Sequence, residues 1–188
     1  MKPKYDNDIL DFVNEFGGIT IEQANKIFFR TKYGYDTAKR RLKKLKEEGL
    51  LKASKDFLTQ KNVYYTYKKP SSHKIMLLNV YAELCFLEAE VVHFEKEFKI
   101  LNKKCDALFV TKYKGVAKMI LVEIDINNKT KDSKYKKVFE SGEVQKIYGT
   151  FPIILIVDKE PIRKTKREKV GYKIERIGYE LDGLKKVI

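Results

Sequence analysis

The sequence predicts an α+β protein with two domains, which we place at residues 1–70 and 73–188. Apolar residues recur at helical spacing from residue 9 to residue 45, and strand-like runs alternate with helical ones after residue 91. Between these parts, Lys68–Ser72 reads KKPSS, which is typical of a linker. With 188 residues, of which 43% are hydrophobic, the chain can bury a core.

Two helices are predicted before residue 30. The first covers residues 6–16, and Gly17-Gly18 ends it. Its apolar face is formed by Ile9, Phe12, Val13 and Phe16. Thr20, followed by Gln23, is the capping-box pattern that opens the second helix. The segment before residue 30 contains three Lys and five acidic residues, a net charge of −2.

Residues 30–69 reverse this charge. Thirteen Lys and Arg stand against four acidic residues, which gives +9 of the chain's net +14. YDTAKRRLKKLKEEGL predicts a helix with Asp36 as its N-cap and Gly49 at its end. Its apolar side is formed by Ala38, Leu42 and Leu45, so its Lys and Arg side chains face solvent.

A two-stranded hairpin is predicted after this helix, because LLKAS and VYYTY alternate apolar and polar residues around the basic tip KDFLTQKN. A basic helix followed by such a hairpin is the second half of a winged helix-turn-helix. The concentrated positive charge indicates a polyanionic partner, with double-stranded DNA as the first candidate. A lysine-rich surface that reflects genome composition is the alternative, and the sign change near residue 30 is harder to explain in that way.

In a winged helix-turn-helix, the second helix of the motif lies in the major groove of DNA. The residues expected to meet DNA there are Tyr35, Thr37, Arg40, Arg41 and Lys44. Lys39 and Lys43 are expected to contact phosphates, and Lys55 and Lys61 to touch the DNA backbone or the minor groove from the hairpin tip. For each single lysine, an ordinary solvated position is an equal alternative.

The second half of the chain predicts a helix, three strands, a helix and a strand. A largely apolar helix covers residues 75–89, and we expect it to be buried in the second domain or between two subunits. The strands contain VVHF, DALFV and AKMILVEIDI, a charged helix follows from about Ser133 to Tyr148, and FPIILIVD is the next strand. The segment YKIERIGY near the C-terminus predicts an edge strand.

Three carboxylates are candidates for one end of this sheet. Glu123 and Asp125 lie two residues apart on one strand and so share a face, and Asp106 begins the neighbouring strand. Such a cluster is what a Mg²⁺-dependent phosphodiesterase needs. The arrangement resembles the PD-(D/E)XK restriction-endonuclease-like fold, except that Asp125 stands where that motif has Lys. We therefore predict no catalytic residues and no cofactor.

If the protein is nevertheless a metal-dependent endonuclease, the resemblance implies Asp106, Glu123 and Asp125 as Mg²⁺ ligands. Lys129 or Lys134 would then have to supply the missing ammonium group. The structural alternative is that Glu123 and Asp125 are strand-end charges paired with nearby lysines.

The chain from Ile9 to Asp158 resembles the replication-relaxation family of plasmid and conjugative-element proteins. The resemblance rests on GGIT, TAKRRLKKLKEEGLL, CDALFV, ILVEIDINNKT and KYKKVF. It implies a winged helix joined to a small α/β nuclease-like domain that is often without activity, and a role in replication or mobilisation of the element. A replication or mobilisation protein is accordingly a candidate partner.

Together these patterns predict a sequence-specific, double-stranded-DNA-binding protein of a plasmid, phage or conjugative element, acting in replication, mobilisation or transcription control. A homodimer is expected, because winged-helix proteins commonly read paired half-sites and the helix Ile75–Ala89 offers an apolar surface. A partner-binding adaptor is a weaker alternative, given the charge of the reading helix. A basic run from Arg163 to Lys169 either extends the DNA contact or protects a sheet edge.

The remaining composition predicts a cytoplasmic protein without a membrane span. Cys85 and Cys105 lie in apolar surroundings and lack metal-ligand spacing, which favours free thiols in a reducing compartment. Apolar runs such as IILIV are too short to cross a bilayer, and KPKYDND at the start has no apolar core.

Overall fold

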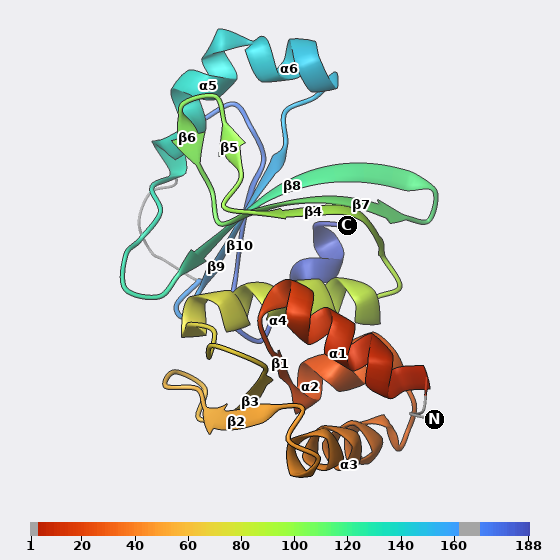
Figure 1. The fold of residues 1–188 in the computed structure, drawn as a ribbon. Helices are drawn as coiled ribbons and strands as arrows, with labels where there is room; N and C mark the ends of the chain where they lie inside the picture. Colours follow the sequence, from red (N-terminus) through yellow and green to blue (C-terminus); the bar gives the residue numbers. More distant parts are fainter. Residues whose placement is uncertain (1–3, 162–169) are drawn as a thin grey trace. The chain divides into compact units, whose positions relative to one another are not determined.

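A computed structural model of the chain describes residues 4–161 and 170–188 (Figure 1). The described part contains six α-helices and a mixed five-stranded sheet, so the predicted α+β class is confirmed. The chain divides into two compact units, Met1–Phe86 and Leu87–Ile188. The division lies after the apolar helix α4 (Ser72–Phe86), which the sequence had placed in the second domain or between subunits. The predicted domain boundaries at residues 70 and 73 stay a prediction.

The first unit consists of helices with a small sheet. Its elements are α1 (Lys4–Phe16), β1 (Ile19–Thr20), α2 (Ile21–Ala24), a π-helix (Asn25–Phe29), α3 (Gly34–Glu47), β2 (Lys52–Lys55), β3 (Asn62–Tyr65) and α4. The sheet order is β1-β3-β2, and both pairings are antiparallel. The predicted hairpin is therefore confirmed, whereas β1 was not expected.

The helix ends follow local chemistry. The predicted capping box is confirmed, because the Thr20 hydroxyl accepts from Gln23 N at 3.2 Å and Gln23 Oε1 accepts from Thr20 N at 2.9 Å. The prediction of Asp36 as an N-cap is wrong, since α3 already begins at Gly34 and has no side-chain cap. A Cβ at Gly34 would lie 2.2 Å from Asn25 Oδ1 and 3.2 Å from Phe29 Cβ, so any larger residue there would require the Asn25 side chain to move.

The core of the first unit joins its helices to its sheet. It is formed by Ile9, Phe12, Val13, Ile19, Ala24, Ala38, Leu42, Leu45, Leu51, Tyr64 and Leu78. The apolar faces predicted for the first and third helices are thus buried, except that Phe16 is only partly buried. Leu78 comes from α4, whose apolar residues are mostly buried in the single chain. The homodimer stays a prediction.

The second unit is organised around the five-stranded sheet, which has the order β10-β9-β8-β7-β4 (Figure 1). The strands are β4 (Glu90–Lys96), β7 (Ala107–Tyr113), β8 (Val116–Asp125), β9 (Ile153–Asp158) and β10 (Ile174–Ile177). β4, β7 and β8 pair antiparallel in sequence order, and β9 and β10 add parallel strands. β10 is the predicted edge strand. A short hairpin, β5 (Lys99–Ile100) and β6 (Lys103–Lys104), was not expected.

The charged helix predicted from Ser133 to Tyr148 is broken into three parts. A 3-10 turn (Asp132–Tyr135) leads into α5 (Lys136–Ser141), and α6 (Glu143–Tyr148) follows after Gly142. Gly142 has a φ of 68°, a left-handed conformation that ends a helix and that glycine adopts without steric cost. Tyr135, Val138 and Val144 of these parts are buried in the core of the second unit together with Leu121 and Ile156 of the sheet.

No helix in residues 4–161 and 170–188 is both long and apolar enough to cross a membrane. The basic run from Arg163 to Lys169 lies outside the described residues.

Candidate nucleic-acid interface

Helix α3 divides its side chains between the core and solvent. Ala38, Leu42 and Leu45 have no exposed surface. The exposed basic residues of the helix are Lys39, Arg40, Lys43, Lys44 and Lys46. Their separation follows from the helical period, because residues three and four apart share a face. The prediction that the basic side chains of this helix face solvent is confirmed for these five residues.

The exposed basic residues of α3 differ in their partners. Lys43 pairs with Glu47 and Lys44 with Glu48, each at 3.6 Å and one turn along the helix. Exposed pairs of this kind contribute little and exchange readily with other ions. Within the described part of the chain, Lys39, Arg40 and Lys46 form no ion pair. These three side chains are the most available for an anionic ligand.

Two of the predicted DNA contacts are engaged inside the first unit. Arg41 is half-buried, and its Nη1 lies 3.6 Å from Oδ2 of Asp6, a carboxylate of α1 that is almost fully buried. The Thr37 hydroxyl donates to the Tyr33 carbonyl at 3.0 Å. Arg41 therefore ties α3 to α1, a role that the sequence pattern could not distinguish from a solvent-facing arginine. Tyr35, by contrast, is 44% exposed at the start of α3.

The tip of the β2–β3 hairpin is basic and tightly hydrogen-bonded. Lys55 and Lys61, the predicted contacts, are both exposed, and Lys61 Nζ pairs with Glu22 Oε1 at 3.1 Å. Asp56, between the two lysines in sequence, is buried and accepts hydrogen bonds from Thr59 N at 2.8 Å and from Ser72 Oγ at 2.5 Å. The tip therefore has a defined shape.

Asp106 and Glu123 lie near each other on adjacent strands of the second unit. Asp106 Oδ2 accepts from Ile124 N at 2.7 Å, across the β7–β8 pairing. Glu123 is 5% exposed and accepts hydrogen bonds from the Tyr135 hydroxyl and from Lys134 Nζ, the latter at 2.5 Å. Burial raises the pKa of Glu123, although both donors oppose that rise. Burial also raises the pKa of the neighbouring Cys105 thiol to about 12, so this free cysteine is inert.

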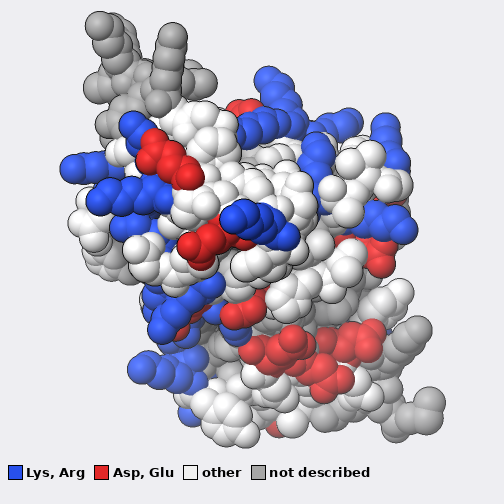
Figure 2. Space-filling view, turned by 90° about the horizontal axis from the view of Figure 1, so that it is seen from above, with Lys and Arg blue, Asp and Glu red and all other residues white. Residues whose placement is uncertain are grey.

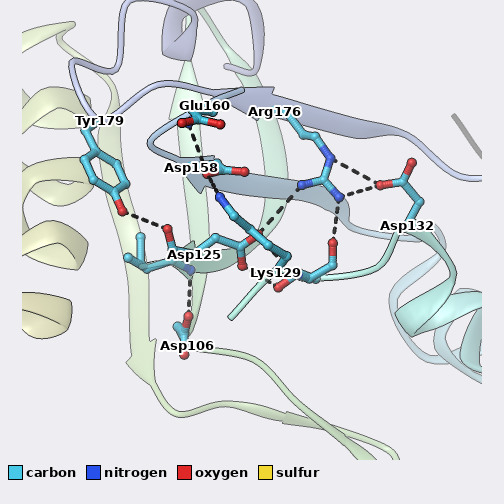
Figure 3. Close-up of polar contacts among 10 residues, drawn as sticks. Asp106, Asp125, Lys129, Asp132, Asp158, Glu160, Arg176 and Tyr179 are labelled. Carbon is cyan, nitrogen blue, oxygen red and sulfur yellow. Dashed lines mark hydrogen bonds and ion pairs between the residues drawn. The ribbon is translucent and has the colours of Figure 1, made fainter. Parts of the chain in front are cut away.

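Asp125 has its own set of partners (Figure 3). Its carboxylate accepts from Thr130 N at 2.9 Å and from Thr130 Oγ1 at 2.7 Å, and Arg176 Nη1 of β10 lies 3.8 Å away. Arg176 also donates to Asp132 Oδ1 through Nη2 at 2.6 Å. The Tyr179 hydroxyl donates to the Asp125 carbonyl at 2.8 Å. These contacts hold the loop that follows β8 against β10.

Lys129 pairs with Asp158, a fully buried carboxylate at the end of β9 (Figure 3). Asp158 is the strand partner of Asp125, so the two acids lie side by side at the same end of the sheet. Lys129 pairs with Asp158, whereas Arg176 faces Asp125. Among the described residues, no group of three His, Cys, Asp or Glu side chains is placed to hold a metal ion. The predicted carboxylates share a sheet end without forming one site.

Positive side chains are spread over the surface as well as along α3. Figure 2 shows one face of the molecule, on which Lys and Arg occur in several separate groups with Asp and Glu among them. On this face the Lys and Arg side chains do not form one uninterrupted patch.

Sequence reasoning missed several residues of these sites. Arg176 and Asp158 come from strands distant in sequence, and only the sheet order places them beside Asp125. Tyr135 was part of a charged helix in the sequence, and nothing in the pattern marked it as the donor to Glu123. Phe57 was treated only as part of a basic hairpin tip, although it is 87% exposed.

Comparison of the chain with protein-family models, with curated proteins and with solved structures finds no match.

Proposed function

We propose that the chain is a sequence-specific, double-stranded-DNA-binding protein whose first unit is a winged helix-turn-helix. The element order α1-β1-α2-α3-β2-β3, with the three strands in one small sheet, supports this fold. In such a fold, α3 would be the helix that enters the major groove and the β2–β3 hairpin would be the wing.

The main support for DNA binding is the exposed basic side of α3. Lys39 and Arg40 project from a helix whose other side is fixed in the core, and both lack an intramolecular ion pair among the described residues. Arg can read guanine edges and Lys can neutralise phosphates, so these side chains suit a duplex. Lys43, Lys44, Lys55 and Lys61 add charge that ligand phosphates could reach after exchange with Glu47, Glu48 and Glu22. Arg41 is omitted because it pairs with Asp6.

We further propose that the second unit is a restriction-endonuclease-like domain that does not cleave DNA. Three antiparallel strands, helical turns and a parallel fourth strand beside β8 support that topology. Its acids do not fit a Mg²⁺ site, because Lys134 and Tyr135 contact Glu123 while Arg176 and Thr130 contact Asp125. Protein cations and donors thus take the positions at these oxygens that a metal would need.

The endonuclease alternative has one observation in its favour. Lys134 Nζ lies 2.5 Å from Glu123 Oε1, so an ammonium group stands beside the Asp106 and Glu123 pair although position 125 is not Lys. No reaction step is assigned to this arrangement, since its carboxylates are not grouped around a common point. A cleavage assay separates the two functions.

The proposed biological setting is a plasmid, phage or conjugative element, with a role in replication, mobilisation or transcription control. Its support is the resemblance of TAKRRLKKLKEEGLL, CDALFV and ILVEIDINNKT to the replication-relaxation family. A homodimer on paired half-sites, in the cytoplasm, belongs to the same proposal.

Binding of a labelled duplex by the full-length protein, followed by fluorescence anisotropy, tests the proposal. Lys39→Ala and Arg40→Ala are each expected to weaken binding by about tenfold, the effect of roughly 1.4 kcal/mol. Lys112→Ala, which removes an exposed lysine of β7, is the matched control and should bind as the wild type does. Equal weakening by all three variants would show that charge alone, and not α3, determines binding.

A further inference from the structure

The β2–β3 hairpin presents an aromatic ring to solvent at its tip. Phe57 is 87% exposed, while Asp56 beside it is 1% exposed. The chain thus buries a carboxylate and exposes a phenylalanine at neighbouring positions, the reverse of the usual preference. Folding of the hairpin does not account for this placement, because the ring buries little surface in the first unit. A ligand that covers the ring would account for it.

The backbone around Phe57 is held in one shape by hydrogen bonds. Asp56 N donates to the Lys61 carbonyl at 2.8 Å, and Gln60 N donates to the Asp56 carbonyl at 3.0 Å. The Asp56 carboxylate accepts from Thr59 N and, at 2.9 Å, from the Thr59 hydroxyl. Ser72 Oγ connects the same carboxylate to the start of α4 at 2.5 Å. Little ordering is therefore needed when the tip meets a ligand, which favours binding.

Positive charge flanks the exposed ring. Lys55 precedes the tip and Lys61 ends it, and both are exposed. Lys55 and Lys61 flank the ring in sequence, and Lys61 Nζ lies 3.1 Å from Glu22 Oε1, a pair that a phosphate could replace. In duplex DNA, phosphates line the grooves, and the apolar faces of the bases become accessible where a base step is opened. Apolar side chains that enter the minor groove between base steps unstack them and bend the duplex. We propose that Phe57 is such a wedge, and that it bends DNA held by α3. The inference rests on the DNA binding proposed above.

The test uses the full-length protein and a duplex of about 25 base pairs with a fluorophore at each end, whose separation reports bending. Wild type and Phe57→Leu are expected to shorten the end-to-end distance, since leucine is also a wedge residue. Phe57→Ala should lose the bend and about tenfold in affinity. Its salt slope should stay unchanged, because the ring neutralises no phosphate. Ile147→Ala, which removes an exposed apolar residue of α6, is the control and should behave as wild type.

The outcomes separate this inference from the function on which it rests. A wild type that binds no duplex would contradict both. A wild type that binds while Phe57→Ala binds and bends equally well would contradict the wedge alone. A third result, in which Phe57→Ala converts a dimer into a monomer without changing the bend, would assign the ring to a second copy of the chain and overturn the wedge. An unchanged melting temperature in Phe57→Ala confirms that folding is intact.

Discussion

At the residue scale, Asp56 shows how a buried carboxylate is stabilised by its neighbours. Burial is the largest single influence on its pKa and raises it, but hydrogen bonds from Ser72 and Thr59 together outweigh burial. The pKa of Asp56 is therefore below its usual value of 3.8. Because the folded-state pKa is lowered, the ionised group contributes stability above pH 3.8 and loses it as the pH falls through the folded-state pKa.

This gives a prediction for acid unfolding. Asp56→Asn is expected to lower the melting temperature at neutral pH, because the charge-assisted hydrogen bonds to Thr59 and Ser72 are replaced by weaker ones. The difference between wild type and variant should shrink as the pH falls from 3.8 towards the lowered folded-state pKa, at which Asp56 of the folded wild type becomes protonated. Circular dichroism melts over a series of pH values measure this. A difference that stays constant down to the lowest pH would show that the carboxylate charge is not involved.

Arg40 and Arg41 are adjacent in sequence, but substitution of Arg41 is predicted to lower stability and substitution of Arg40 to weaken DNA binding. Arg41→Ala leaves the buried Asp6 carboxylate without its cation and should destabilise the protein by about 1–3 kcal/mol. Arg40→Ala removes an exposed side chain and should change stability by less than about 0.5 kcal/mol, while it weakens duplex binding. Urea unfolding measures the first effect and anisotropy the second. Equal loss of stability in both variants would contradict the assignment of Arg41 to the core side.

Residue-level prediction from sequence worked where the signal was local. Thr20 and Gln23 are three residues apart, and their capping box is found as expected. Arg41 and Arg40, in contrast, carry the same charge on the same helix, and only the position of Asp6 on α1 distinguishes them. The side of a helix to which a long side chain turns depends on partners that the helical period does not reveal.

At the element scale, hydrophobic periodicity located most helices and strands. The strands β7, β8 and β9 were found because each is a run of apolar and β-branched residues, and α1 because its apolar face recurs at helical spacing. The helix expected over residues 133–148 is interrupted, because Gly142 adopts a left-handed conformation that a periodic pattern does not register. The very short strands β1 and β5 carry too few residues for an alternation to be seen.

The carboxylates of the second unit show the same limit of prediction from sequence for a functional site. Sequence correctly placed Glu123 and Asp125 on one strand and Asp106 beside it. Whether three acids share one metal or take separate partners depends on Lys134, Lys129 and Arg176. Arg176 comes from β10, a strand that enters the sheet only through its pairing with β9.

At the scale of the whole molecule, the second unit is predicted to accompany DNA binding without cleavage. Plasmid and single-stranded DNA incubated with the full-length protein and Mg²⁺ or Mn²⁺ should remain intact, because Glu123 and Asp125 are paired with Lys134 and Arg176. Gel electrophoresis detects nicking. Asp106→Ala and Glu123→Ala are the matched variants. Nicking by the wild type that disappears in both would establish the endonuclease alternative.

We propose that α3 supplies the charges that bind duplex DNA, and the salt dependence of the binding affinity measures this contribution. The logarithm of the association constant should fall steeply with the logarithm of salt concentration for the wild type, since each neutralised phosphate contributes about 0.9 to the slope. Lys39→Ala/Arg40→Ala should reduce the magnitude of that slope by about 0.9, because Lys39 neutralises a phosphate whereas Arg40 reads a base edge. Lys112→Ala should leave it unchanged. A wild-type affinity that does not vary with salt, or a slope that the double variant shares with the wild type, would contradict the claim.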